Sequence, residues 1–233
     1  MNSIPKSGTN LLENALLNLP SLRGGLLRTL MTLPGISDEV IAARIRGIKK
    51  GQFIVAHLTA NPGLLSLVHD EGIRSLLMVR DPRDIAVSHF KYLTGMDLTH
   101  RFHGYFASLP NDDARLMASI DGVVGALRDY ADWLDDPGTL VVRFEDLIGP
   151  AGGGSQDRQL KAVGDIASHL GIVISEKEIQ EISLRIFSTK TPTFRSGRIG
   201  GWKKTFKPEH VKAFKDIAGD LILRYGYEND VNW

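Results

Sequence analysis

Three segments of the chain combine basic, hydroxyl and glycine residues at spacings that suit an anion. The first, residues 5–10 (PKSGTN), stands between a short apolar stretch and a helical pattern. Glycine lets the backbone wrap closely around a ligand, and a helix N-terminus offers N–H groups and partial positive charge. Lys6 adds a charge, while Ser7 and Thr9 add hydroxyl donors. The segment predicts a phosphate or sulfate site, with an ordinary turn as the alternative interpretation.

Two further segments carry similar chemistry later in the chain. Arg80 follows an apolar run, and Ser88 lies eight residues on along a predicted helix, so a guanidinium and a hydroxyl can hold a second phosphate. Residues 194–203 (FRSGRIGGWK) hold three glycines, two arginines and a lysine, which can fold over an anionic ligand. The alternatives are capping residues with surface ion pairs for the second segment, and a solvated basic loop for the third.

Composition limits the class of protein. The 233 residues carry a formal net charge of +1, so a broad electrostatic attraction to nucleic acid is not expected. The absence of cysteine rules out a disulfide scaffold and a thiolate metal site, and no carboxylate cluster indicates a metal. The N-terminus lacks a signal-peptide pattern, and no stretch approaches the ~20 apolar residues of a membrane span. We expect a single cytoplasmic domain over residues 1–233.

Short apolar runs alternate with helical patterns, which predicts an α/β fold with a parallel sheet flanked by helices. The expected strands are residues 2–5, 52–56, 74–79 and 139–144. The expected helices are 8–19, 37–48, 61–72, 81–93, 112–134, 158–170, 175–186 and 208–224, with caps at Ser37, Asn61 and Asp81. Residues 95–110 are expected as a loop or short helices, and residues 149–156 as a surface loop. Ligands of such sheets bind at the carboxyl ends of the strands.

A histidine follows one of these strands. His57 comes directly after residues 52–56, where it can face the loop at Lys6. A neutral imidazole accepts a proton near neutral pH, so His57 is a candidate general base. A lone histidine after an apolar strand is more often structural, and both interpretations stay open on the residues alone.

Taken together, the three segments resemble the sulfotransferase family in content, order and interval. Residues 5–10 match its 5'-phosphosulfate loop (PKSGTTW), Arg80 and Ser88 match its 3'-phosphate segment, and residues 194–203 resemble its RKGxxGDWK loop. Residues 142–147 (VRFEDL) resemble its Y-E-D-L stretch, and the resemblance runs from Ile4 to about Tyr225. It implies a P-loop-like fold and sulfuryl transfer from 3'-phosphoadenosine 5'-phosphosulfate (PAPS) to a hydroxyl or amine of a small-molecule acceptor, with PAP released and no metal.

The resemblance also assigns roles to residues. The 5'-phosphosulfate would be held by Lys6, Ser7, Gly8, Thr9 and Asn10. The 3'-phosphate would be held by Arg80 and Ser88, with Arg195, Ser196 and Gly197. Phe144 would lie near the adenine, His57 would be the base, and Lys6 would stabilise charge on the departing phosphate. The chain departs from the family pattern at Val55, because the family has a lysine two residues before the histidine.

Two other functions remain as alternatives. A P-loop nucleotide kinase or other phosphotransferase shares the sheet and an anion loop, but the chain has no G-x-x-x-x-G-K-[ST] sequence. A non-catalytic module that binds PAP would use the same loops without turnover. The acceptor and the oligomeric state are left open. The aromatic residues at 102–106 indicate either an aromatic-lined acceptor pocket or ordinary core packing.

Overall fold

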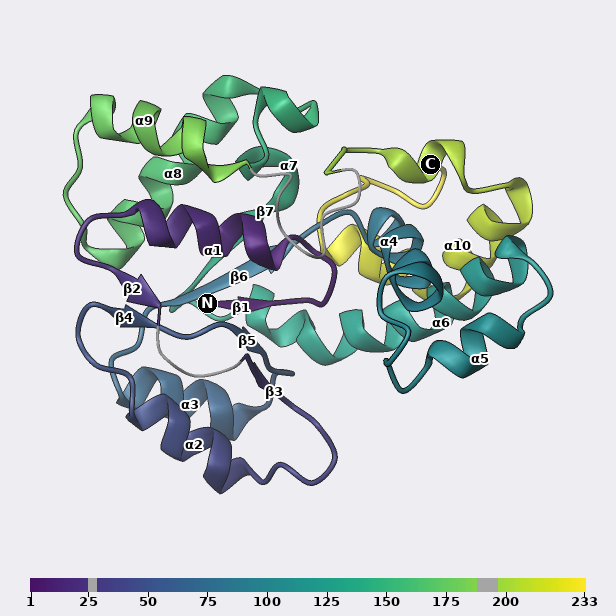
Figure 1. Cartoon of the computed structure of the whole chain (residues 1–233), viewed down its shortest axis with the longest axis horizontal. Coiled ribbons are helices and arrows are strands. Elements are labelled where there is room, and N and C mark those ends of the chain that lie inside the picture. The colour runs from purple at the N-terminus through teal and green to yellow at the C-terminus, as the bar shows by residue number, and fades with distance from the viewer. Residues whose placement is uncertain (25–28, 188–196) are drawn as a thin grey trace.

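Among the residues that the computed structural model describes (1–24, 29–187 and 197–233), five short parallel strands form the main sheet. Their order is β3-β5-β1-β6-β7 (Figure 1). The strands are β1 (Asn2–Ser3), β3 (Leu30–Met31), β5 (Ala56–His57), β6 (Ser75–Val79) and β7 (Thr139–Arg143). A separate parallel pair joins β2 (Arg23–Gly24) to β4 (Gln52–Phe53). The predicted α/β fold with a parallel sheet is confirmed.

The central strand β6 divides the hydrophobic core in two. Leu76 and Met78 belong to one buried cluster, and Leu77 and Val79 belong to the other. Successive side chains of a strand point to opposite faces of the sheet, so an unbroken apolar run buries both faces at once. The apolar run from Leu76 to Val79 therefore requires helices on each side of the sheet.

Helices cover both faces (Figure 1). The cluster with Leu76 and Met78 packs under α1 (Thr9–Asn18), α8 (Gln156–Leu170) and α9 (Glu176–Ile186). The other cluster takes residues from α2 (Asp38–Arg46), α3 (Pro62–Asp70), α4 (Pro82–Gly95), α5 (His103–Ser108), α6 (Asp112–Tyr130) and α10 (Pro208–Arg224). The short α7 (Phe144–Leu147) follows β7, and 3-10 turns span η1 (Ala131–Leu134), η2 (Pro150–Gly152) and η3 (Gly201–Lys204).

Helices α3 and α4 begin at the residues that their predicted N-caps indicate. Asn61 accepts a hydrogen bond from the Leu64 N–H at 2.8 Å, and Pro62 opens α3. Asp81 accepts from the Arg83 N–H at 2.9 Å, and Pro82 opens α4. Ser37 stands at the N-cap position of α2, but its side chain caps no helix N–H. A proline at the first helical position loses nothing there, because its missing N–H would have no partner in the helix.

Three predicted elements differ from the observed ones. Residues 52–56 form two short strands instead of one, because β4 pairs with β2 while β5 joins the main sheet between β1 and β3. The helix expected over 112–134 ends as α6 at Tyr130 and continues as the 3-10 turn η1. The loop at 149–156 is only partly a surface loop, since Gly152 is buried.

The sheet brings the chemical residues to one edge. The loop at residues 5–8 follows β1, Arg80 follows β6 and Phe144 follows β7. His57 is the last residue of β5. All these strands run in parallel, so their carboxyl ends meet along the same edge, where such folds bind their ligands.

Candidate active site

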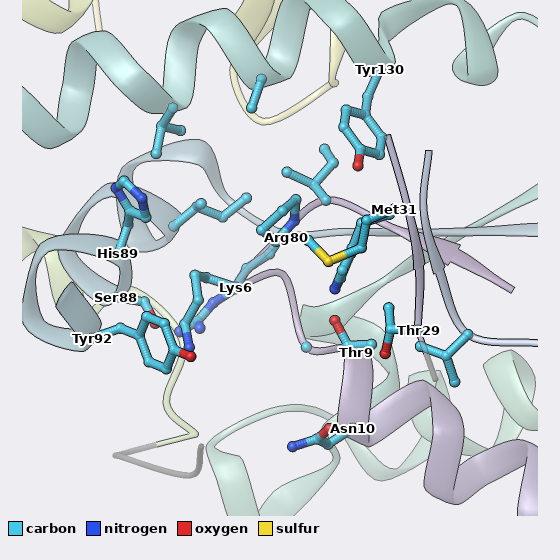
Figure 2. A pocket seen from close by; sticks show the side chains of 18 of the residues that line it. Lys6, Thr9, Asn10, Thr29, Met31, Arg80, Ser88, His89, Tyr92 and Tyr130 are labelled. Carbon is cyan, nitrogen blue, oxygen red and sulfur yellow. The ribbon is translucent and has the colours of Figure 1, made fainter. Parts of the chain in front are cut away.

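A cavity of about 1410 Å³ lies along this edge of the sheet. Its walls include predicted site residues from several separate segments of the chain. These residues are Lys6, Gly8, Thr9, Asn10, His57, Arg80, Ser88, Phe144 and Gly197. Figure 2 shows Ser88, His89 and Tyr92 on one side of the pocket, and Thr9, Thr29 and Met31 on the other. The structure thus gathers residues that lie far apart in the sequence, from Lys6 near its start to Gly197 near its end.

The loop after β1 has an unusual backbone. Lys6 and Gly8 have φ angles of 70° and 112°, both in the left-handed region. A side chain at Gly8 would place its Cβ 2.6 Å from Phe144 Cδ2, so only glycine fits between the loop and this ring. Within the described chain, no acceptor receives the backbone N–H of Gly8 or Thr9 at the start of α1. Unbonded N–H groups and the dipole at a helix N-terminus are the features that favour an anion.

The Lys6 side chain leads into the cavity. Its Nζ lies 3.6 Å from the centre of the Tyr92 ring, which is a cation–π contact. Its charge also contributes to lowering the pKa of both His57 and His89. Both histidines therefore lie within electrostatic reach of the Lys6 amine.

The predicted hydroxyl contact from Ser7 is not supported by the geometry. Ser7 Oγ donates to the carbonyl oxygen of Met78 at 2.9 Å, and its backbone N–H donates to Ile4 O at 3.0 Å. The side chain is fully buried and does not line the cavity. Ser7 therefore fixes the loop against β6.

Arg80 leaves β6 with one nitrogen unsatisfied. Its Nη2 donates to the Arg198 carbonyl at 2.8 Å and lies 3.6 Å from Asp84 Oδ2, while its guanidinium lies 4.2 Å from the Phe144 ring centre. Its Nε is buried and has no hydrogen-bond partner among the described residues. A buried donor without a partner costs about 1–3 kcal/mol, so this N–H fits an anionic ligand that accepts from it.

A carboxylate that no sequence motif indicates holds the third segment in place. Asp84 accepts hydrogen bonds from the backbone N–H groups of Gly200 and Trp202, each at 2.8 Å. Burial raises its pKa, against the opposing effect of Arg80. The bonds tie the segment at 197–203 to α4, next to Arg80. Gly197 lines the cavity, whereas the predicted Arg195 and Ser196 lie outside the described residues.

Arg83 also links α4 to the C-terminal part of the chain. Its guanidinium lies 4.0 Å from the Trp202 ring centre and 4.4 Å from that of Trp233. It forms ion pairs with Asp81 at 2.8 Å and Glu228 at 2.5 Å. A buried guanidinium with two carboxylates and two aromatic faces is fully partnered. Arg83 is therefore a structural residue beneath the site.

Hydrogen bonds fix the tautomer of His57. Its Nδ1 lies 2.7 Å from the carbonyl oxygen of Ser3, which can only accept, so Nδ1 carries the proton. Nδ1 also lies 3.1 Å from Ser3 Oγ, which in turn contacts Thr9 Oγ1 at 2.9 Å. Nε2 then keeps its lone pair, and the ring lines the cavity. Burial lowers the pKa of His57, which keeps the imidazole neutral and able to accept a proton.

The aromatic residues at 102–106 do not form a common pocket wall. Phe102 lines the cavity, but Phe106 is buried in the core and Tyr105 is exposed. His103 Nδ1 lies 2.7 Å from the Leu93 carbonyl. Tyr92, His89 and Tyr130 supply rings to the cavity instead, from α4 and α6. The sequence could have indicated Tyr92 and His89, because they follow Ser88 on the same helix.

The described residues offer neither a metal site nor a membrane span. No group of three or more histidine, aspartate or glutamate side chains among them is placed to hold a metal ion. In the same ranges, no helix combines the length and apolar character that crossing a membrane requires.

The model of the sulfotransferase domain family matches residues 1–226. The chain belongs to this family. The fold of this sulfotransferase is similar to that of mouse sulfotransferase SULT7A1 in complex with PAP, with a TM-score of 0.65 and 20% identity over 95% of this chain and 82% of that chain. It is also similar to that of retinol dehydratase in complex with androsterone and inactive cofactor PAP, with a TM-score of 0.63 and 17% identity over 95% of this chain and 79% of that chain. Among curated proteins, none matches the sequence.

Proposed function

We propose that this sulfotransferase moves the sulfuryl group of PAPS to a hydroxyl or amine of a small-molecule acceptor and releases PAP. The observation that carries the proposal is a pair of anion sites on one cavity. One is the N-terminus of α1 with Lys6, and the other is Arg80 with its buried Nε, which has no partner among the described residues. Two anionic groups on one ligand, as in PAPS, fit such a pair better than the single phosphate chain of ATP does.

The residues present fit this donor in detail. The Gly8 and Thr9 N–H groups and the Lys6 amine would hold the 5'-phosphosulfate, with Asn10 beside them. Arg80, Ser88 and Gly197 would hold the 3'-phosphate, and we propose that Arg195 and Ser196 also contact it. Phe144 lies against Arg80 and lines the cavity, so its ring is available to the adenine.

The chemistry of the chain then follows from three groups. His57 Nε2 accepts the proton of the acceptor hydroxyl as its oxygen forms a bond to sulfur, and the bond from sulfur to the phosphate oxygen breaks in line. PAPS supplies the sulfuryl group and leaves as PAP. Lys6 and the N–H groups at the start of α1 stabilise charge on the departing phosphate and the sulfuryl oxygens. Val55 also lines the cavity and adds no charge.

Calorimetric titration with PAP, and with ADP plus magnesium, tests the donor. We expect at least a tenfold preference for PAP (about 1.4 kcal/mol) that is lost in Arg80→Ala. Arg158→Ala is the matched control, because Arg158 is exposed and pairs with Asp146 away from the cavity. Equal affinity for ADP, or an unchanged Arg80→Ala variant, would favour a phosphotransferase.

Turnover separates an enzyme from a binding module. Release of PAP from PAPS is measured with a panel of hydroxyl and amine acceptors, on the wild type and His57→Ala. We expect His57→Ala to bind PAP normally and to lose roughly 100-fold or more in kcat, the usual contribution of a general base. Normal PAP binding without any turnover by the wild type would favour the non-catalytic module.

A further inference from the structure

A second histidine of the cavity has a tautomer fixed by its neighbours. His89 Nδ1 lies 2.9 Å from Ser119 Oγ on α6. The Ser119 hydroxyl donates its only proton to the carbonyl oxygen of Ala86, at 2.8 Å. Ser119 Oγ must therefore accept from His89, which places the imidazole proton on Nδ1. Nε2 of His89 is left as a hydrogen-bond acceptor.

Nothing else in the described chain uses this acceptor. No described group donates to His89 Nε2, and the atom is not among the buried polar atoms that lack a partner. The ring lines the cavity, and Figure 2 shows it on α4 at the opposite end of the pocket from Tyr130. Phe106 packs edge-on against the ring, at 5.7 Å between ring centres, and Gly122 lies near the ring carbon Cε1. The Nε2 atom therefore meets the cavity.

The ring also stays neutral. Burial lowers the pKa of His89 to about 4, and the charges of His100 and Lys6 act in the same direction. The neighbours from α5 and α6, Phe106 and Ser119, are uncharged. A protonated His89 would turn Nε2 into a donor, so its low pKa keeps it an acceptor at neutral pH.

We propose that His89 Nε2 accepts a hydrogen bond from a second donor group on the sulfuryl acceptor. The inference rests on the proposed function, and it names a substrate class: compounds that carry another hydroxyl or N–H besides the group that is sulfated. His57 Nε2 receives the reacting hydroxyl, and His89 Nε2 receives the second one. Both histidine rings line the same cavity, which is the arrangement that one acceptor molecule with two donor groups requires.

His89 is a specificity residue here, and not the base. The chain gives His57 contacts to Ser3 and, through it, to Thr9 of the anion loop, whereas His89 is tied to α6. Removing His89 Nε2 should thus change which acceptor binds, and should leave PAP binding intact. The cavity lining also includes the apolar residues Ile85, Leu93 and Val123, which favours an acceptor with a carbon frame.

The test compares diols with their monomethyl ethers. Benzenediols and hexanediols, each with its monomethyl ether, are titrated into the wild-type PAP complex and assayed for sulfation with PAPS. We expect at least one diol to be preferred tenfold or more over its ether, because the ether leaves His89 Nε2 without a donor. His89→Phe should abolish that preference, and His89→Gln, which keeps an acceptor oxygen, should restore part of it.

The outcomes separate this inference from the donor assignment. If PAP binds and sulfation proceeds, but ethers match diols or His89→Phe keeps the preference, the His89 inference fails alone. Absence of binding by every diol also overturns it. If the wild type does not bind PAP, the proposed function itself fails.

Ring spectroscopy provides a readout that a purely structural role would not move. In ¹⁵N–¹H correlation spectra we expect the His89 ring as the neutral Nδ1–H tautomer from about pH 8 to about pH 5, above its lowered pKa. Ser119→Ala should give a mixture of tautomers and a smaller diol preference, with unchanged PAP binding. An Nε2–H tautomer in the wild type would contradict the inference.

Discussion

Replacing Gly8 by alanine tests the closest contact in the anion loop. Gly8 has φ 112°, and a Cβ there would lie 2.6 Å from Phe144 Cδ2 and 2.9 Å from Met78 Cε. Both neighbours are themselves buried. The new methyl group can be accommodated only if the loop or the Phe144 ring moves.

The expected cost has two parts. A left-handed backbone at alanine costs about 1–2 kcal/mol, and overpacking of a dense core costs about 1–3 kcal/mol. We therefore expect Gly8→Ala to lower the free energy of unfolding by about 2–5 kcal/mol, a large share of the typical 5–15 kcal/mol. Displacement of Phe144 from Arg80 should also weaken PAP binding by roughly tenfold, about 1.4 kcal/mol.

Gly72 serves as a control that separates the backbone cost from the steric cost. Gly72 has φ 63°, and no atom lies within 4 Å of a Cβ built on it. Gly72→Ala should therefore show only the backbone cost, about 1–2 kcal/mol, with normal PAP affinity. Urea unfolding and calorimetry measure both variants. Equal losses of stability in the two variants would refute the steric contribution, and wild-type PAP affinity in Gly8→Ala would refute the link from Gly8 to the ligand.

Three further predictions concern the site. Burial lowers the pKa of His57, so the proposed base stays deprotonated as the pH falls. We therefore expect kcat/KM to remain level from about pH 8 to about pH 6.5 and to decline only below that pH. A decline that begins above about pH 7 would contradict this expectation. Asp84→Asn replaces the carboxylate that accepts hydrogen bonds from two loop N–H groups, and it should weaken PAP binding about tenfold in calorimetry. The control Asp216→Asn, at an exposed ion pair, should leave PAP binding unchanged. Tyr92→Leu removes the ring under the Lys6 amine and should lower kcat roughly threefold to tenfold, while Tyr92→Phe keeps it near the wild type; equal kcat in both variants would refute the contact.

Much of the site could be predicted because its signals are local. A glycine and a hydroxyl-rich turn at residues 5–10 mark the anion loop without knowledge of the rest of the chain. Asp81 and Pro82 mark the start of α4, and so place Arg80 at the end of β6. Parallel strands bring the residues at their carboxyl ends to one edge of the sheet, so His57 also reaches the cavity.

The remaining features depend on partners far along the chain. Asp84 holds Gly200, which lies 116 residues away, and nothing near either residue indicates the other. Ser7 gives its hydroxyl to a carbonyl of β6, so a residue type that suits an anion serves the loop instead. The tautomer of His89 depends on Ser119, which lies on a different helix. Such long-range hydrogen bonds leave no period or spacing in the sequence.

The packing of Arg83 against two indole rings also gives the protein an optical signal. Two of its three tryptophans, Trp202 and Trp233, contact this guanidinium, and Trp202 is tied by Asp84 to the helix that follows Arg80. The third, Trp133, lies in the core. Occupation of the Arg80 site should therefore change the intrinsic fluorescence of the chain, and a Trp133→Phe variant would keep the change while removing the constant background. Nucleotide binding could then be followed in real time without a label.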